Sequence, residues 1–326
     1  MTVNHHIEQF HGLPVFDFVQ AVDAAVEGAA DEAAEAGGAV VPGLPEPTAV
    51  AWRIGLNYES EEAFTERWEQ FLDTVDAGRV AAVVIGPWFS EEPEGLGSAL
   101  EAITGAAGRL PALRGLFVGD ITYEESEISW LEMEDVTPLL TAFPRLTELV
   151  VRGGTGLRLE PVRHEALTAL RFEAGGLPVE VVRAVAGCDL PALRRLELWL
   201  GVDHYGGDAG VVDLAPFLDG TRFPALRHLG LQNSLLQDDI AAAVAHAPVV
   251  ARLESLSLSM GALTDQGVTA LLEGQPLTHL RTLDLHHHFL TEDVQQRLRE
   301  ALPEVGLVLT GAGKPDDRRR YVAVSE

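Results

Sequence analysis

A short apolar pattern, L-x-x-L-x-L with other aliphatic or aromatic residues allowed, returns along the chain at intervals of 21 to 33 residues. Its last two apolar positions are two residues apart. They therefore point to one side of a short strand, and the residue between them points to the other side. Eight copies in phase predict eight strands, and a ninth, weaker copy begins at Leu302. The eight copies begin at Val80, Leu113, Leu146, Leu167, Leu193, Leu226, Leu253 and Leu280.

Between the strands the apolar residues change to helical spacing. Val268, Leu271 and Leu272, for example, share one helical face, and Thr264 and Thr291 are suited to begin helices as N-caps. One strand with one helix cannot bury its apolar face alone, whereas stacked copies can. The pattern thus predicts an α/β fold over residues 80–309, with a parallel sheet covered on one side by helices.

These cores, together with helix openings such as Leu263–Gly267, resemble leucine-rich-repeat proteins of the ribonuclease-inhibitor-like kind. The resemblance implies a horseshoe-shaped solenoid with the sheet on the concave side and the helices on the convex side. One feature departs from the family: the asparagine expected three positions after the last strand leucine is absent. That position holds Trp88, Ile121, Gly154, Gly175, Gly201, Ser234, Gly261 and His288, so the turning backbone needs other hydrogen-bond partners.

The whole chain also resembles a bacterial, actinobacterial-type family of cytoplasmic leucine-rich-repeat proteins. The resemblance rests on the segments Phe10–Phe18, Val50–Ile54, Leu198–Gly201 with Tyr205–Asp208, and Arg320–Val324. It implies an architecture and a cytoplasmic location, and no particular activity.

The two ends lie outside the repeats. Residues 1–79 are expected to form an N-terminal cap, with a strand at Val50–Ile54 and a helix at Ser60–Asp76. The Ala- and Glu-rich segment Asp23–Gly38 fits either an exposed helix or a mobile loop. Residues 310–326 are expected to form a loop and a short closing strand.

Composition narrows the function classes. The chain of 326 residues carries 50 acidic and 23 basic side chains, a net charge of −27, and its one lysine is Lys314. This balance argues against nucleic acid and anionic membranes as partners and favours a basic protein or peptide. No apolar run is long enough to span a bilayer, and no secretory signal is visible. The one cysteine, Cys188, excludes an intrachain disulfide and a cysteine-based zinc site.

Two insertions follow strand ends and are therefore expected on the same rim of the sheet. Asp120–Asp135 holds seven acidic residues with Tyr123 and Trp130, and Gly201–Asp213 holds Asp203, His204, Tyr205 and Asp208 among glycines. Such loops are either solvated acidic surface or binding loops, and the sequence leaves both open.

The register of the repeats brings chemically varied side chains onto the exposed sheet face. Arg171 is expected beside Glu197, and Arg152 beside Glu173, which stabilises neighbouring strands. The same side chains suit a protein-binding surface, because Arg and aromatic residues are common anchors. The predicted partner-binding residues are Phe117, Arg152, Arg171, Arg195, Glu197, Trp199, His204, Tyr205, His228, Gln232, Asp284 and His286.

Signs of catalysis are weak. Asp284, His286 and His228 suggest a metal, but two residues on one strand and a distant third do not make a site, and His288 fits a turn. Cys188 has no histidine nearby in sequence and is expected to be a buried structural residue. No nucleotide-binding or nucleophile motif occurs. The sequence therefore predicts a non-catalytic protein- or peptide-binding scaffold without cofactor or metal. The alternatives are a substrate-holding subunit of a modifying enzyme and, third, a metal-assisted enzyme.

Overall fold

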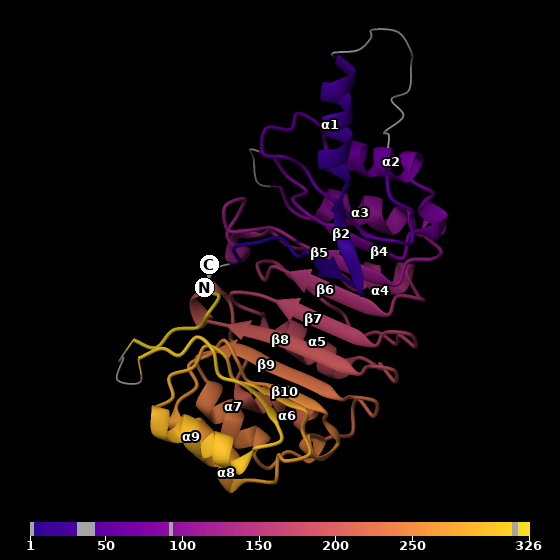
Figure 1. Cartoon of the computed structure of the whole chain (residues 1–326). Helices are drawn as coiled ribbons and strands as arrows, with labels where there is room; N and C mark the ends of the chain where they lie inside the picture. Colours follow the sequence, from indigo (N-terminus) through magenta and orange to yellow (C-terminus); the bar gives the residue numbers. More distant parts are fainter. Residues whose placement is uncertain (1–2, 31–42, 91–93, 315–318) are drawn as a thin grey trace.

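The computed structural model describes residues 3–30, 43–90, 94–314 and 319–326 (Figure 1). These residues form one sheet of 12 strands whose spatial order is the chain order. The first pair is antiparallel and all later pairs are parallel. The strands are β1 Gln9–Phe10, β2 Leu13–Asp17, β3 Ala51–Ile54, β4 Ala82–Ile85, β5 Gly115–Val118, β6 Glu148–Arg152, β7 Ala169–Glu173, β8 Arg195–Gly201, β9 His228–Ser234, β10 Ser255–Ser257, β11 Thr282–Asp284 and β12 Gly306–Val308.

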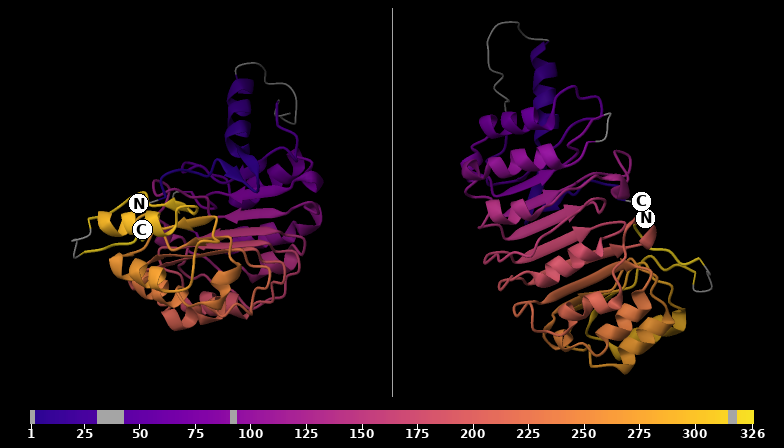
Figure 2. Two further views of the ribbon diagram at one scale, coloured as in Figure 1. Left: turned by 60° about the horizontal axis from the view of Figure 1, so that its bottom comes forward. Right: turned by 180° about the vertical axis from the view of Figure 1, so that it is seen from behind.

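Helices cover one face of this sheet and stack in the same order as the strands (Figure 2). They are α1 Phe18–Ala30, α2 Phe64–Thr74, α3 Gly97–Gly105, α4 Thr137–Ala142, α5 Val179–Gly187, α6 Val211–Leu218, α7 Gln237–Val244, α8 Asp265–Glu273 and α9 Glu292–Ala301. The α/β class and the repeating strand–helix order agree with the prediction. The connection between β6 and β7 has no helix, as its short interval of 21 residues allows.

The apolar positions of the repeat build a single continuous core. Leu229 and Leu231 of β9, and Leu256 of β10, are fully buried against the helices, as are the matching residues of the neighbouring strands. Burial of this one face explains why the pattern fixes the register: a slip of one residue would turn every leucine outward.

Hydrogen bonds link successive repeats where their helices begin. The backbone N–H and the hydroxyl of Thr264 both donate to the carboxylate of Asp238, and those of Thr291 donate in the same way to Asp265. Both threonines also cap their own helices, as predicted. His288 has the turn role expected of it: its Nδ1 accepts from the N–H of Leu290, and its Nε2 lies 3.2 Å from the carbonyl of Leu309.

The ends differ from prediction in two respects, the start of the sheet and the tail, and agree with it elsewhere. The sheet starts at β1, so residues 1–79 contribute three strands, with β3 and α2 close to the places expected. α1 occupies the first part of Asp23–Gly38, and residues 31–38 lie outside the described residues. The prediction of a closing strand near the C-terminus is wrong: residues 319–326 are extended but form no strand, because they cross the ends of the strands instead of pairing with an edge.

Candidate functional site

The helix-free face of the sheet carries the candidate site, and its register is the one predicted from the repeats. Arg171 pairs with Glu197, and Arg152 with Glu173, on adjacent strands. The next row joins Arg195 of β8 to His228 of β9. The polar side chains of the face are therefore neighbours across strands, and their contacts can be followed from one strand to the next.

An ionic network crosses the middle of the face. Arg152 Nε lies 2.7 Å from Glu173 Oε2, and the other oxygen of Glu173 lies 3.1 Å from Arg171 Nη1. Arg171 then reaches Glu197 at 3.2 Å, and Arg195 reaches the same carboxylate at 2.7 Å. Burial alone would raise the pKa of Glu197, but His228 and the two arginines outweigh burial and hold it at about 2. Glu197 is therefore ionised at neutral pH.

Beyond Glu197 the network passes to a histidine and a serine. His228 Nε2 lies 2.8 Å from Glu197 Oε1 without the alignment of a linear hydrogen bond, and its Nδ1 lies 2.6 Å from Ser255 Oγ. Carboxylate, imidazole and hydroxyl stand in the order that nucleophilic catalysis uses. Here two guanidinium groups already neutralise the carboxylate. We therefore interpret the arrangement as the polar end of the network.

The N-terminal residues 3–17, named here the arm, cover the first half of this face. Phe10 packs edge-on against Phe117 at 5.8 Å between ring centroids, and His11 Nδ1 lies 2.8 Å from Glu148 Oε2. Phe117 and Arg152 are 2% and 4% exposed. The prediction that these two residues belong to an accessible surface is therefore wrong: Phe10 of the arm covers Phe117, and the guanidinium of Arg152 is enclosed by Glu173, the carbonyl of Ile121 and the Phe117 ring.

The arm is fixed by a cluster of charges around Arg53. Arg53 lies 2.8 Å from Asp17 Oδ2 and 3.0 Å from Asp120 Oδ2. His6 lies 3.3 Å from Asp120 and 3.4 Å from Glu125. Its hydrogen bonds to these two carboxylates raise the pKa of His6 to about 9, so the imidazole is charged at neutral pH.

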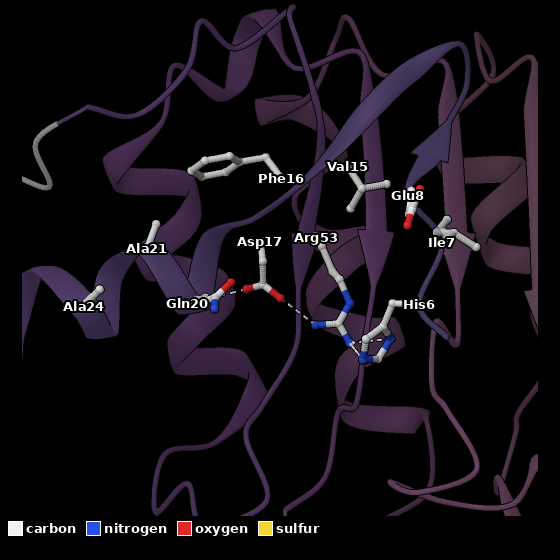
Figure 3. A pocket seen from close by; sticks show the side chains of 10 residues that line it. All are labelled: His6, Ile7, Glu8, Val15, Phe16, Asp17, Gln20, Ala21, Ala24 and Arg53. Atoms are coloured by element: carbon white, nitrogen blue, oxygen red, sulfur yellow. Dashed lines mark hydrogen bonds and ion pairs between the residues drawn. The ribbon is translucent and has the colours of Figure 1, made fainter. Parts of the chain in front are cut away.

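The arm, α1 and Arg53 border an open hollow of about 780 Å³ (Figure 3). Its polar lining includes Arg53, which lies close to both Asp17 and His6, as Figure 3 shows. The sequence reasoning missed this cluster. The feature that could have revealed it is the sheet register, because Asp17 of β2 lies beside Arg53 of β3. β3 is the strand that precedes the first recognised repeat. Because each charge in the cluster is already paired, we assign it to holding the arm.

The segment of residues 319–326, named here the tail segment, crosses the carboxyl ends of the strands, and Figure 1 shows the C-terminus at this rim. The side-chain amide of Asn233 bonds to both backbone polar groups of Val324. Its Nδ2 donates to the carbonyl, and its Oδ1 accepts from the N–H at 3.0 Å. The N–H of Ala323 donates to the carbonyl of Met260 at 2.7 Å.

The tail segment also joins the two insertions. Ser129 of the first insertion donates to the carbonyl of Ser325 at 2.6 Å, and Tyr205 of the second donates to Glu326 at 2.5 Å. That hydrogen bond raises the pKa of Tyr205 to about 12. The prediction that both insertions lie on one rim is thus confirmed.

The remaining predicted residues divide into two groups. Glu197 and Gln232 are buried in the polar network, which corrects their expected exposure. The accessible group comprises Arg171, Arg195, Trp199, His204, Tyr205, His228, Asp284 and His286.

The histidines and Cys188 have structural contacts. His286 Nδ1 lies 2.9 Å from Asp284, and His287 Nε2 lies 3.0 Å from the carbonyl of Tyr321. His228 is engaged elsewhere, and the residues that the structure describes bring no three metal-ligating side chains together. Cys188 is buried as predicted, and burial raises the pKa of its thiol.

A comparison with solved structures gives a match over nearly the whole chain. A crystal structure of a protein from Bacteroides fragilis, a structural-genomics target, is similar over 94% of this chain and 86% of that one, with a TM-score of 0.78 and 26% sequence identity. The two chains therefore share the α/β fold over nearly their whole length. No protein-family model and no curated protein matches the chain. In the described part of the chain, no helix combines the length and apolar character needed to cross a bilayer.

Proposed function

We propose that this chain is a leucine-rich-repeat solenoid of the bacterial, cytoplasmic kind that acts as a non-catalytic scaffold for a protein or peptide. Three observations support the repeat assignment: the buried L-x-x-L-x-L positions, the parallel strands in chain order, and the helices stacked beside them. Repeat proteins of this architecture present a broad continuous sheet face, which suits binding better than catalysis.

The observation that carries the proposal is the uncovered half of the sheet face. The arm lies over β3 to β6 and the tail segment crosses the strand ends, whereas the side chains of Arg171, Arg195 and His286 are 32%, 50% and 33% exposed. Trp199 is half-buried beside them. Arginine and tryptophan anchor many protein interfaces because each offers a large contact area and a directed polar group.

Charge indicates the kind of partner. The accessible arginines share Glu197, so this part of the face is mixed in sign, while the neighbouring insertion Asp120–Asp135 adds acidic side chains on the rim. A partner with basic residues that approach the rim would gain from electrostatic steering. Its hydrogen-bonding groups would meet Arg195 and the Asp284–His286 pair.

A charge-reversal experiment tests the proposal. Native protein and Arg195→Glu would be used as bait in cell extract, and retained proteins identified by mass spectrometry at low and high salt. We expect a specific partner that is retained by the native chain and at least tenfold less by Arg195→Glu. Arg297→Glu is the matched control, because it makes the same charge change on the outer helix α9. Equal loss with both variants, or no partner that distinguishes them, would contradict the proposal.

A further inference from the structure

The tail segment is held mainly through its backbone, in the manner of a bound peptide. Asn233 satisfies both the N–H and the carbonyl of Val324, Met260 accepts the N–H of Ala323, and Ser129 donates to the carbonyl of Ser325. Such contacts are available to any extended segment. Side-chain selection comes from Ala323 and Val324, which are buried against Ile128, Met260 and Trp199.

The receiving groups are positioned independently of the tail segment. Asn233 has a left-handed backbone (φ 58°), and its Nδ2 is also within 3.2 Å of the carbonyl of Ala174 on the β7 side. The amide is therefore oriented by the sheet itself. A preorganised receiving group lowers the entropic cost of binding.

The tail segment also leaves apolar surface uncovered beside the place where it docks. Trp130 follows Ser129 and is 67% exposed, and Leu235 follows the Asn233–Ser234 pair and is 50% exposed. A second copy's tail segment would have the same sequence and would leave the same side chains exposed. A larger partner that extends past the tail segment would cover them.

We infer that the rim site, formed by Ile128, Ser129, Trp199, Asn233 and Met260, binds an extended peptide segment of a partner protein that presents a pair of small apolar side chains. The tail segment is its exchangeable occupant. This inference rests on the proposed scaffold function and names the chemistry of the partner segment. It adds a site at the strand ends that shares Trp199 with the Arg195 surface and otherwise uses different residues.

The test uses the full chain and a labelled synthetic peptide with the sequence of residues 319–326, blocked at both ends. In Val324→Asp, a buried carboxylate should release the tail segment while leaving the rim site intact. We expect the peptide to bind Val324→Asp at least tenfold more tightly than the native chain, as measured by fluorescence anisotropy. Adding Asn233→Gly, which keeps the left-handed backbone but removes the amide, should weaken that binding about tenfold.

Controls make each outcome decisive. A peptide with Asp in place of its second valine should not bind, and Ala323→Asp is a second release variant should Val324→Asp not fold. If neither folds, excess isotopically labelled peptide should displace the tail segment of the native chain, seen as faster hydrogen exchange in residues 319–326.

Three results would overturn the inference. They are equal peptide affinity in native and released chains, indifference to Asn233→Gly, and a native dimer that Val324→Asp dissociates. The last would mean that a second copy supplies the occupant. Arg195→Glu should leave peptide binding unchanged, so failure of the scaffold proposal and failure of the rim site are distinguishable.

Discussion

Individual charged residues on the sheet face have distinct energetic roles because their burial differs. Glu173 is 3% exposed in its side chain and is shared by Arg152 and Arg171. Removing one partner from a buried network leaves the others desolvated and unpaired. Glu165 provides a contrast, since its side chain is 64% exposed and pairs with Arg163, itself at the surface.

We expect Glu173→Gln to lower the free energy of unfolding by about 3 kcal/mol, because it leaves the buried guanidinium of Arg152 and the partly exposed one of Arg171 with one fewer carboxylate. Glu165→Gln should change it by no more than about 0.5 kcal/mol, since water screens that pair. Urea denaturation followed by circular dichroism measures both. Similar small effects for the two variants would contradict the idea that burial makes the loss of the Glu173 carboxylate costly.

At the scale of the element, helix starts are tied to the preceding repeat. Thr291 caps α9 through the N–H of Val294 and at the same time donates from its hydroxyl to Asp265 at the start of α8. One hydroxyl thus links consecutive helices.

Thr291→Ala should therefore destabilise the chain by about 1 to 2 kcal/mol, which is the upper part of the range for loss of an N-cap. Thr278→Ala, in the turn after α8, is the matched control and should be close to neutral. Thermal denaturation of the two variants measures this difference in stability. A melting temperature for Thr291→Ala equal to that of Thr278→Ala would contradict a role for this hydroxyl beyond local polarity.

At the scale of the whole molecule, the arm closes one end of the sheet face by a pH-dependent contact. The pKa of His6 is raised from 6.5 to about 9 by Asp120 and Glu125. The stabilisation is therefore complete below about pH 6.5 and is lost as the pH rises through 9.

Native protein and His6→Gln should consequently differ most in unfolding free energy near pH 6, by about 1 kcal/mol after allowance for solvent screening. The difference should vanish by about pH 10. Urea denaturation at several pH values measures the difference, and comparing the two chains cancels other groups that titrate in the same range. A difference that stays constant from pH 6 to 10 would exclude His6 as the group responsible.

Much of the fold followed from the sequence because the leucine positions are repeated and buried. The register derived from Leu167–Phe172 and Leu193–Leu198 placed Arg171 beside Glu197 correctly. The coverage of the face was not predictable in the same way. Phe10 over Phe117 and Val324 beside Asn233 are contacts between segments far apart in the chain, and no periodic pattern records them. Sequence spacing predicts neighbours in a stack but not the segments that cross it.

The helix-free connection between β6 and β7 affects where insertions and deletions can be accepted during evolution. The outer layer is divided there into a block from α2 to α4 and a block from α5 to α9, each with its own stacked helices. An insertion or deletion at this seam would disturb no helix–helix interface. Length differences among related chains should therefore be tolerated best at the exposed residues Glu160 and Pro161, which lie between the bridges Asp135–Arg158 and Arg163–Asp189, while the Arg152–Glu173 pair keeps the two blocks joined through the sheet.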